Sequence, residues 1–236
     1  MYGGCVTIII PAYKSADRLL NYTIPYLSKL RSLDEKKWFR EVVIISEEES
    51  PKSVDKVVEL CKSLNYDVLY ITPSKRLGKG KAIFLGALKA KCTTLLIIDV
   101  DVPIQAEEAF LTALKSLKEN VIVWCSRSTY ATCLWRKALS LVFRAVMSFI
   151  LKQRLDSQCG VKAFPKHIFI ELYSSVREHG YFYDIFIAKE AVKKRLPVKT
   201  LYVKYRGSRA GELNNPLFAL KLIPKAVKSL ATIATS

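Results

Sequence analysis

The stretch TTLLIIDVDVPIQ, residues 93–105, contains an apolar run from Leu95 to Ile98 and then two carboxylates, Asp99 and Asp101. The apolar run predicts a buried strand, and in open α/β sheets ligands bind beyond the carboxyl ends of the strands. Because side chains alternate in an extended chain, both acids would point to one side and offer oxygen ligands to Mg²⁺ or Mn²⁺ carrying a diphosphate. A solvated loop with two chance acids is the alternative for so short a motif.

The neighbouring segments alternate between strand and helix patterns. Strands are indicated by CVTIIIPAY (5–13), which Pro11 closes, and by REVVIIS (40–46), YDVLYIT (66–72) and NVIVWCS (120–126). Helices are indicated by residues 16–33, 50–64, 78–92 and 103–117, the second of them opened by a capping serine and Pro51. Such alternation predicts an α/β fold, with a mainly parallel sheet covered by helices on both faces.

The composition predicts one globular domain of 236 residues, half of them hydrophobic. We find no leader pattern and no apolar run of spanning length, which favours a cytoplasmic protein. The cysteines form no C-x-x-C pair, so buried thiols are expected and a zinc site is not. The six cysteines are Cys5, Cys61, Cys92, Cys125, Cys133 and Cys159.

The net charge of +17 is unevenly distributed. Residues 127–236 hold 20 basic and 6 acidic side chains, whereas residues 1–126 hold 18 and 15. An excess of this kind favours nucleic acid, an anionic membrane surface or a phosphorylated substrate as partner.

Two basic segments are amphipathic. In LWRKALSLVFRAVMSFILK (134–152) the polar residues fall on one arc of a helix and the rest is apolar; the tail from 216 to 236 has a similar composition. Packing against the core could absorb either apolar face. If the substrate is a lipid phosphate, the two segments together favour peripheral attachment to the cytoplasmic face of an anionic membrane, without a transmembrane helix.

The stretch RLGKGKA (76–82) precedes a predicted helix. Its glycines would let the backbone approach a ligand, and Lys79 and Lys81 place positive charge near the helix N-terminus. The spacing fits neither a Walker A loop nor G-x-G-x-x-G, so an ordinary loop with solvated lysines is an equal alternative.

Taken in order, VTIIIPAY, RLGKGKAIFLGAL, IIDVD, CSR, DSQCGVKAF and YDIFIAKEAVKKRLPVKTLYVKYRGSRAG resemble the inverting family 2 glycosyltransferases that charge polyprenyl phosphates. The resemblance implies a GT-A catalytic domain over residues 1–215, with the interface helix 134–152 inside it and C-terminal amphipathic helices. It also implies transfer of a hexose from UDP-glucose or GDP-mannose to dolichyl or another polyprenyl phosphate, with inversion and with Mg²⁺ or Mn²⁺. DSQCGVK lies closer to the glucosyltransferase branch than to the mannose branch.

The same resemblance assigns site residues. The donor would be bound by Pro11, Ala12, Tyr13, Glu47, Gly78, Lys79, Gly80 and Arg209, and the metal by Asp99 and Asp101. The acceptor phosphate would be bound by Arg127, Arg136 and Ser140. Asp101, Asp156 and Arg127 are the implied catalytic residues.

Some of these positions keep an alternative. Asp156 could be a structural carboxylate that caps a loop, although Gln158, Gly160 and Lys162 beside it also fit the family motif. Asp184 could serve the site or cap the helix IFIAKEAVKK. The chain also departs from the family pattern: Lys14 and Ser15 follow PAY, SEEES replaces an expected D-D-G-S, and Phe186 replaces a glutamate.

Two other functions are considered. A family 2 enzyme could use a soluble or glycan acceptor. A neutral hydroxyl acceptor would require a catalytic base, and it would not need phosphate-binding residues such as Arg127 and Arg136. A basic nucleic-acid-binding protein would be expected to show a binding motif or aromatic residues within a basic stripe. We find neither in the sequence, so no nucleic acid is expected as partner.

Overall fold

The computed structural model describes residues 4–47, 51–102, 104–127, 159–176, 180 and 182–204, with side chains except at residues 51–53. Within these residues seven strands form one sheet in the order β3-β2-β1-β4-β6-β5-β7. The strands are β1 (Val6–Tyr13), β2 (Phe39–Glu47), β3 (Asp67–Ile71), β4 (Thr94–Ile98), β5 (Ile122–Arg127), β6 (Val161–Pro165) and β7 (Val198–Val203). All are mutually parallel except β6, which runs antiparallel to β4 and β5. The predicted mainly parallel α/β sheet is therefore confirmed.

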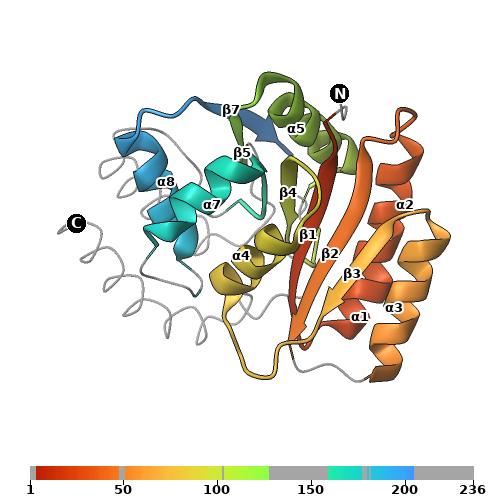
Figure 1. Cartoon of the computed structure of the whole chain (residues 1–236). Helices are drawn as coiled ribbons and strands as arrows, with labels where there is room; N and C mark the ends of the chain where they lie inside the picture. Colours follow the sequence, from red (N-terminus) through yellow and green to blue (C-terminus); the bar gives the residue numbers. More distant parts are fainter. Residues whose placement is uncertain are drawn as a thin grey trace, which may run out of the picture.

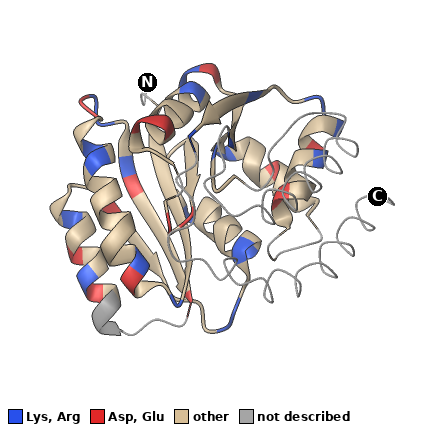
Figure 2. Cartoon of the chain, turned by 180° about the vertical axis from the view of Figure 1, so that it is seen from behind, with Lys and Arg blue, Asp and Glu red and all other residues tan. Residues whose placement is uncertain are grey.

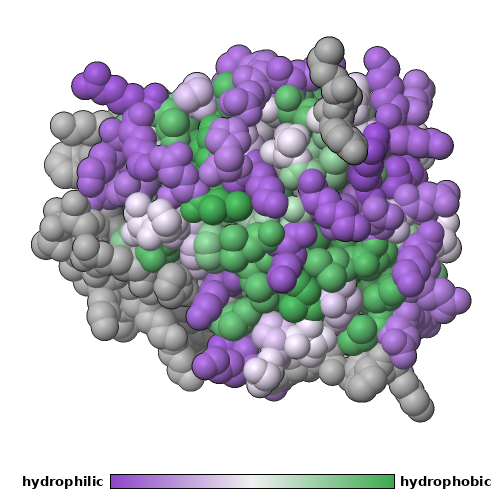
Figure 3. Space-filling view, viewed as in Figure 1, coloured by the Kyte–Doolittle hydropathy of each residue, from purple (hydrophilic) through white to green (hydrophobic). Residues whose placement is uncertain are grey.

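Helices cover both faces of the sheet (Figure 1). One face carries α1 (Ala16–Arg18), the π-helical turn η1 (Leu19–Thr23), α2 (Ile24–Ser32), α3 (Pro51–Ser63) and α5 (Ala106–Glu119). The other carries α4 (Lys79–Lys89), α7 (Lys166–Ser174) and α8 (Tyr183–Lys193). Hydrophobic residues are visible over the middle of this second face, around α4 (Figure 3).

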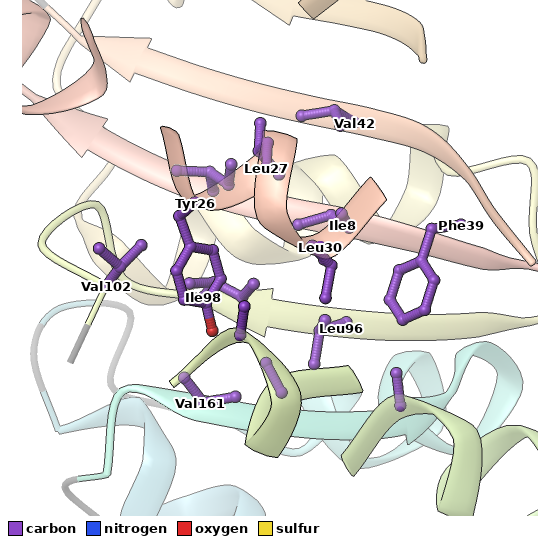
Figure 4. Close-up of a cluster of buried hydrophobic side chains, with 14 of the residues drawn as sticks. Ile8, Tyr26, Leu27, Leu30, Phe39, Val42, Leu96, Ile98, Val102 and Val161 are labelled. Atoms are coloured by element: carbon purple, nitrogen blue, oxygen red, sulfur yellow. The ribbon is translucent and has the colours of Figure 1, made fainter. Parts of the chain in front are cut away.

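Strands β1 and β4 are largely apolar because their alternate residues enter two different cores. Ile8 of β1 packs with α2 and α5 in the cluster drawn in Figure 4, whereas Ile9 packs with α4 on the opposite face. Both side chains are fully buried. Charged residues gather instead on the helices and at the strand ends, as the view from behind shows (Figure 2). Among the described helices, none combines the length and apolar character needed to cross a bilayer.

Pro11 does not close β1, contrary to the sequence prediction. The strand continues to Tyr13 and stays paired with β2, Pro11 lying opposite Ile45. Its pairing with β4 ends earlier, at Ile9. A proline lacks the backbone N–H of a ladder bond, and it is tolerated here because β1 has a strand neighbour on only one side at this point.

The helix predicted over residues 16–33 contains a π-helical turn. The N–H of Ile24 bonds to the carbonyl of Leu19, five residues back, and Pro25 follows at the start of α2. Proline has no N–H to donate to the carbonyl four residues back, which favours this irregular turn. The turn places Thr23 where its hydroxyl donates to the carbonyl of Val100, in the loop after β4.

The expectation of free thiols is wrong for two cysteines. Cys5 and Cys92 form a disulfide across 87 residues of sequence, at the edge of the sheet where β1 and β4 begin. Closing a loop of this size stabilises a fold by about 4 to 5 kcal/mol in the chain-entropy account. Cys61 and Cys125 are buried free thiols, Cys159 is buried as well, and burial raises the pKa of Cys61 to about 11. Cys133 lies outside the described residues.

Candidate active site

The carboxyl ends of the parallel strands bring most of the predicted site residues to one edge of the sheet. Tyr13 and Glu47 end β1 and β2, Asp99 follows β4, and Arg127 ends β5. The antiparallel strand β6 begins at this same edge, so Gly160 lies beside the end of β4. The edge is thus lined by residues from segments that are far apart in the sequence, as the topology of open α/β sheets predicts for a ligand site.

Asp99 and Asp101 lie in a turn and not in an extended strand. Strand β4 ends at Ile98, and the N–H of Val102 donates to the carbonyl of Asp99 over 2.9 Å. The alternation argument for the two carboxylates is therefore wrong, since it assumed extended backbone. The turn keeps both residues together at the strand end, and both are partly exposed.

Val102 holds this turn in an uncommon conformation. Its φ of 42° lies in the left-handed region, which costs energy for a β-branched side chain. The side chain is buried and lies beside Tyr26 in the apolar cluster (Figure 4). Thr23 holds the Val100 carbonyl, and the Tyr26 hydroxyl donates to the Gln105 carbonyl over 3.1 Å. Packing and hydrogen bonds on both sides therefore fix the loop that presents the two acids.

Lys79 forms an ion pair with Asp99. Its Nζ lies 2.7 Å from Asp99 Oδ1, and about a quarter of each side chain is exposed. Lys79 is the first residue of α4, where Gly78 precedes the helix with a φ of 85° that favours glycine. The N–H of Gly80 donates to the carbonyl of Gly180 over 3.2 Å, which ties this loop to the segment before α8. The predicted glycine-lysine loop and the carboxylate turn thus meet.

Gly160 packs directly against Asp99. The N–H of Asp99 donates to the Gly160 carbonyl over 3.0 Å, and a Cβ built on Gly160 would lie 2.4 Å from Asp99 Oδ2. The missing side chain leaves the room that this carboxylate oxygen occupies. Mg²⁺ and Mn²⁺ prefer oxygen ligands, and Mg²⁺ is usually bound by one or two carboxylates together with substrate phosphates. The donor set of Asp99 and Asp101 fits such an ion.

The other end of the site is built around Tyr13 and Glu47. Glu47 is buried, its Oε1 accepts the N–H of Leu77 over 3.2 Å, and its carbonyl accepts the N–H of Lys14. It therefore joins the end of β1 to the loop before α4. Its contact with a nucleotide base stays a prediction.

Arg76 was missed by the sequence analysis. Its guanidinium carbon lies 4.1 Å from the centre of the Tyr13 ring, a stacking arrangement of a cation on an aromatic face. The signal available in the sequence was its place at the start of RLGKGKA. Pro11 and Ala12 lie in the last residues of β1, and Ala12 is buried, so only their backbone and the partly exposed Pro11 ring could border a ligand.

Arg127 is partly exposed at the end of β5. The other predicted residues of the acceptor and donor sites, Arg136, Ser140, Asp156 and Arg209, lie outside the described residues, as do the segments 134–152 and 216–236. Their roles stay predictions.

Asp184 does not cap α8, since Phe182 occupies that position and Asp184 lies in the first turn. Its Oδ2 lies 3.0 Å from Nζ of Lys162, and both side chains are almost fully buried. This pairing was not predicted from the sequence. Two opposite charges, each inside an apolar run, were the available signal, because buried charges are normally paired.

Residues 7–174 match the family described as glycosyl transferase family 2. Curated relatives include the dolichyl-phosphate beta-glucosyltransferase of Saccharomyces cerevisiae, 24% identical over 227 residues, which cover 85% of this chain and 66% of that protein. The enzyme of the same name from Homo sapiens is 23% identical over 218 residues, covering 85% of this chain and 67% of that protein. The chain thus spans about two thirds of the length of these curated relatives.

Solved structures agree on the fold. The chain is similar to glucosyl-3-phosphoglycerate synthase of Mycobacterium tuberculosis, with a TM-score of 0.69 and 17% identity over 97% of this chain and 80% of that one. A crystal structure of that enzyme with Mn²⁺, UDP-glucose and phosphoglyceric acid gives a TM-score of 0.67 and 16% identity, covering 97% of this chain and 78% of that one. The fold is GT-A, and the match over residues 7–174 shows that the chain belongs to glycosyl transferase family 2.

Proposed function

We propose that this chain transfers glucose from UDP-glucose to dolichyl or another polyprenyl phosphate, with inversion and with Mg²⁺ or Mn²⁺. The observation that carries the proposal is the Lys79–Asp99 ion pair at the carboxyl edge of a GT-A sheet, with Asp101 in the turn that follows Asp99. The names of the curated relatives support glucose and dolichyl phosphate over the GDP-mannose alternative. The complex of a structural neighbour with UDP-glucose supports a uridine donor.

Asp99 and Asp101 would hold the divalent ion, which when bound supplies positive charge to a diphosphate leaving group. Lys79 is placed to add a second positive charge at the same edge, because its ammonium group already lies against Asp99. Tyr13, Arg76 and Glu47 would border the nucleotide. The loop fixed by Val102 and Thr23 keeps the two acids in place, so little reorganisation accompanies binding.

A phosphate acceptor needs no catalytic base. It is already ionised near neutral pH, so the protein must position and desolvate it. Arginine suits this task because its guanidinium group offers paired donors to phosphate oxygens. Arg127 is the described residue assigned to it, with Arg136 and Ser140 as further proposed ligands. Asp156 is proposed to contact the donor sugar or the acceptor near the reacting carbon.

The acceptor assignment is tested by replacing Arg127 or Arg136 with lysine. The parent protein in detergent is expected to transfer sugar from UDP-glucose to dolichyl phosphate in the presence of Mn²⁺. Each substitution should raise the acceptor KM about 10-fold and lower turnover, because a paired, charged hydrogen bond is lost. The KM for UDP-glucose should stay near that of the parent.

Arg40→Lys serves as the matched control. Arg40 is exposed at the start of β2, at the end of the strand away from the site, so this substitution should leave the KM for the acceptor and the KM for UDP-glucose unchanged. If the lysine variants keep the parent acceptor KM, binding of the acceptor phosphate is assigned to the wrong residues. If the parent transfers glucose to a soluble acceptor such as 3-phosphoglycerate and not to dolichyl phosphate, the alternative of a soluble acceptor replaces the proposal.

We further propose peripheral attachment to an anionic membrane surface through the basic segments 134–152 and 216–236, which the sequence analysis placed at the cytoplasmic face. Their sequences combine apolar residues with lysine and arginine, which anionic headgroups attract. The Cys5–Cys92 disulfide disagrees with the cytoplasmic placement, because the cytosol keeps thiols reduced.

The attachment predicts sedimentation with vesicles that contain anionic lipid. Deleting residues 216–236 removes Lys221, Lys225 and Lys228 and should weaken binding by about 100-fold at low salt, at roughly 1 kcal/mol per basic residue. High salt should release part of the parent protein, since it screens only the charge contribution. Vesicles of neutral lipid are the control. Parent protein left in the supernatant with anionic vesicles would contradict the attachment.

A further inference from the structure

The buried pair Lys162–Asp184 lies next to the site and has no assigned task. Lys162 is the second residue of β6, where it lies opposite Ile97 of β4 and Trp124 of β5. Its side chain is 2% exposed and that of Asp184 is 4% exposed. Asp184 comes from the first turn of α8, so the pair joins that helix to the middle of the sheet.

The ammonium group of Lys162 is surrounded by fixed partners. It donates to the carbonyl of Cys159 over 2.7 Å, contacts Asp184 Oδ2 at 3.0 Å and lies 5.2 Å from the centre of a Trp124 ring. The Cys159 carbonyl belongs to the residue directly before Gly160. Lys162 therefore fixes the turn that enters β6, and Asp184 supplies the charge that makes a buried ammonium group tolerable.

The Cys159–Gly160 turn also fixes the position of Asp99. The Gly160 carbonyl accepts the N–H of Asp99, and the Gly160 Cα faces the Asp99 carboxylate so closely that a Cβ would clash with it. A continuous set of contacts thus runs from Asp184 through Lys162, Cys159 and Gly160 to Asp99. Burial is the largest cause of a pKa of Tyr183 well above its ordinary value, followed by the charge of Asp184, and the charge of Asp99 contributes as well.

The Lys162–Asp184 ion pair is not expected to stabilise the fold by much. Among the described residues, Asp184 Oδ1 is buried without a hydrogen-bond partner, which adds a cost to that of burying two charges. Replacing a buried ion pair by apolar side chains is often neutral or stabilising. Burying the pair therefore costs free energy of folding. Its contacts lead to Asp99, a carboxylate of the proposed metal site.

We infer that Lys162 and Asp184 are positioning residues that hold the Asp99 carboxylate in its metal-binding orientation through the Cys159–Gly160 turn. The inference rests on the proposed function, because it takes Asp99 to be a metal ligand. Groups that support a metal ligand from behind commonly change metal affinity by about 10- to 100-fold when they are removed. Lys162 and Asp184 act through Asp99 and need not contact substrate.

The test is the double substitution Lys162→Met with Asp184→Leu, read as Mn²⁺ binding by electron paramagnetic resonance in the presence of UDP. Removing both charges avoids leaving one of them buried and unpaired, so the variant should melt near the parent temperature. Its Mn²⁺ affinity should fall by about 10- to 100-fold. Lys162→Met alone leaves Asp184 uncompensated and should also lower the melting temperature.

The matched control is the double substitution Thr7→Val with Glu41→Leu. Thr7 donates to Glu41 Oε2 over 2.6 Å, and both are buried near the opposite edge of the sheet. This control should change the melting temperature and leave the Mn²⁺ affinity at the parent value. If the Lys162/Asp184 variant binds Mn²⁺ as tightly as the parent does, the positioning role is wrong and the metal site still stands. A parent protein that binds no Mn²⁺ with UDP would overturn the metal site and, with it, this inference.

Discussion

Alanine at Asp101 or at Asp99 is expected to reduce sugar transfer by about 1,000-fold or more, because charge stabilisation by a bound metal is worth several kcal/mol and each 1.4 kcal/mol is tenfold in rate. The fold should persist in both variants. Both residues are partly exposed in a turn that the packing of Val102 and the hydroxyl of Thr23 hold from the other side. The partly exposed Lys79–Asp99 ion pair contributes little to stability in comparison.

The two substitutions should differ in one respect. Asp101 is expected to be the more sensitive in transfer, since the family resemblance places it closer to the metal. Asp99→Ala also removes an ion-pair partner of Lys79, whose ammonium group can still attract the donor diphosphate. Measuring UDP binding with and without Mn²⁺ separates these effects: Mn²⁺ should strengthen UDP binding in the parent and have no effect in either variant.

Asp67→Ala provides the control for these measurements. Asp67 begins β3 at the opposite edge, and its pair with Lys91 is 3.9 Å long and largely exposed. Its loss should alter neither transfer nor the effect of Mn²⁺. The assignment of the metal site is wrong if Mn²⁺ strengthens UDP binding equally in the parent and in the Asp99 and Asp101 variants.

The sequence predicted strands β1, β2, β4 and β5 well because they are buried on both faces, but it missed β7, which is parallel to β5 and only partly buried. Residues such as Ile8 and Ile9 enter opposite cores, which leaves an unbroken apolar run that is easy to recognise. The glycine-lysine loop and the two acids were also placed at the correct edge, since the carboxyl ends of parallel strands meet there. The extended backbone expected at Asp99 and Asp101 was wrong, because the turn that ends in the left-handed Val102 depends on tertiary packing.

Strand β6 shows what the local pattern could not reveal. It has five residues, and Lys162 interrupts its apolar character. The lysine is tolerated only because Asp184, more than twenty residues away in the sequence, lies 3.0 Å from it in the fold. The disulfide between Cys5 and Cys92 is a pairing of the same kind, formed because β1 and β4 are neighbours in the sheet. Long-range pairs of this kind follow from topology, which a window of sequence does not contain.

Gly160→Ala is expected to impair the metal site with little effect on the rest of the fold. The new Cβ would lie 2.4 Å from Oδ2 and 2.8 Å from Cγ of Asp99, so the carboxylate must move. Asp99 cannot retreat as a unit, because its N–H is bonded to the Gly160 carbonyl and its Oδ1 is paired with Lys79. A displacement near 1 Å at a catalytic site can cost about 100-fold in rate. Transfer should therefore fall by about 100-fold, and Mn²⁺ affinity with UDP should fall with it.

Gly86→Ala is the matched control, because it adds the same methyl group but places it against apolar core side chains instead of a site carboxylate. Its Cβ would lie 2.7 Å from Cδ1 of Ile45 and 3.0 Å from Cγ2 of Ile9, inside the core between α4 and the sheet. Overpacking of this sort costs about 1 to 3 kcal/mol of stability. Gly86→Ala should therefore melt at a lower temperature and keep its Mn²⁺ affinity. Gly160→Ala should melt near the parent temperature and lose Mn²⁺ affinity. If both variants lost stability and neither lost metal affinity, Gly160 would be a packing residue only, and the room beside Asp99 would have no role in binding the metal.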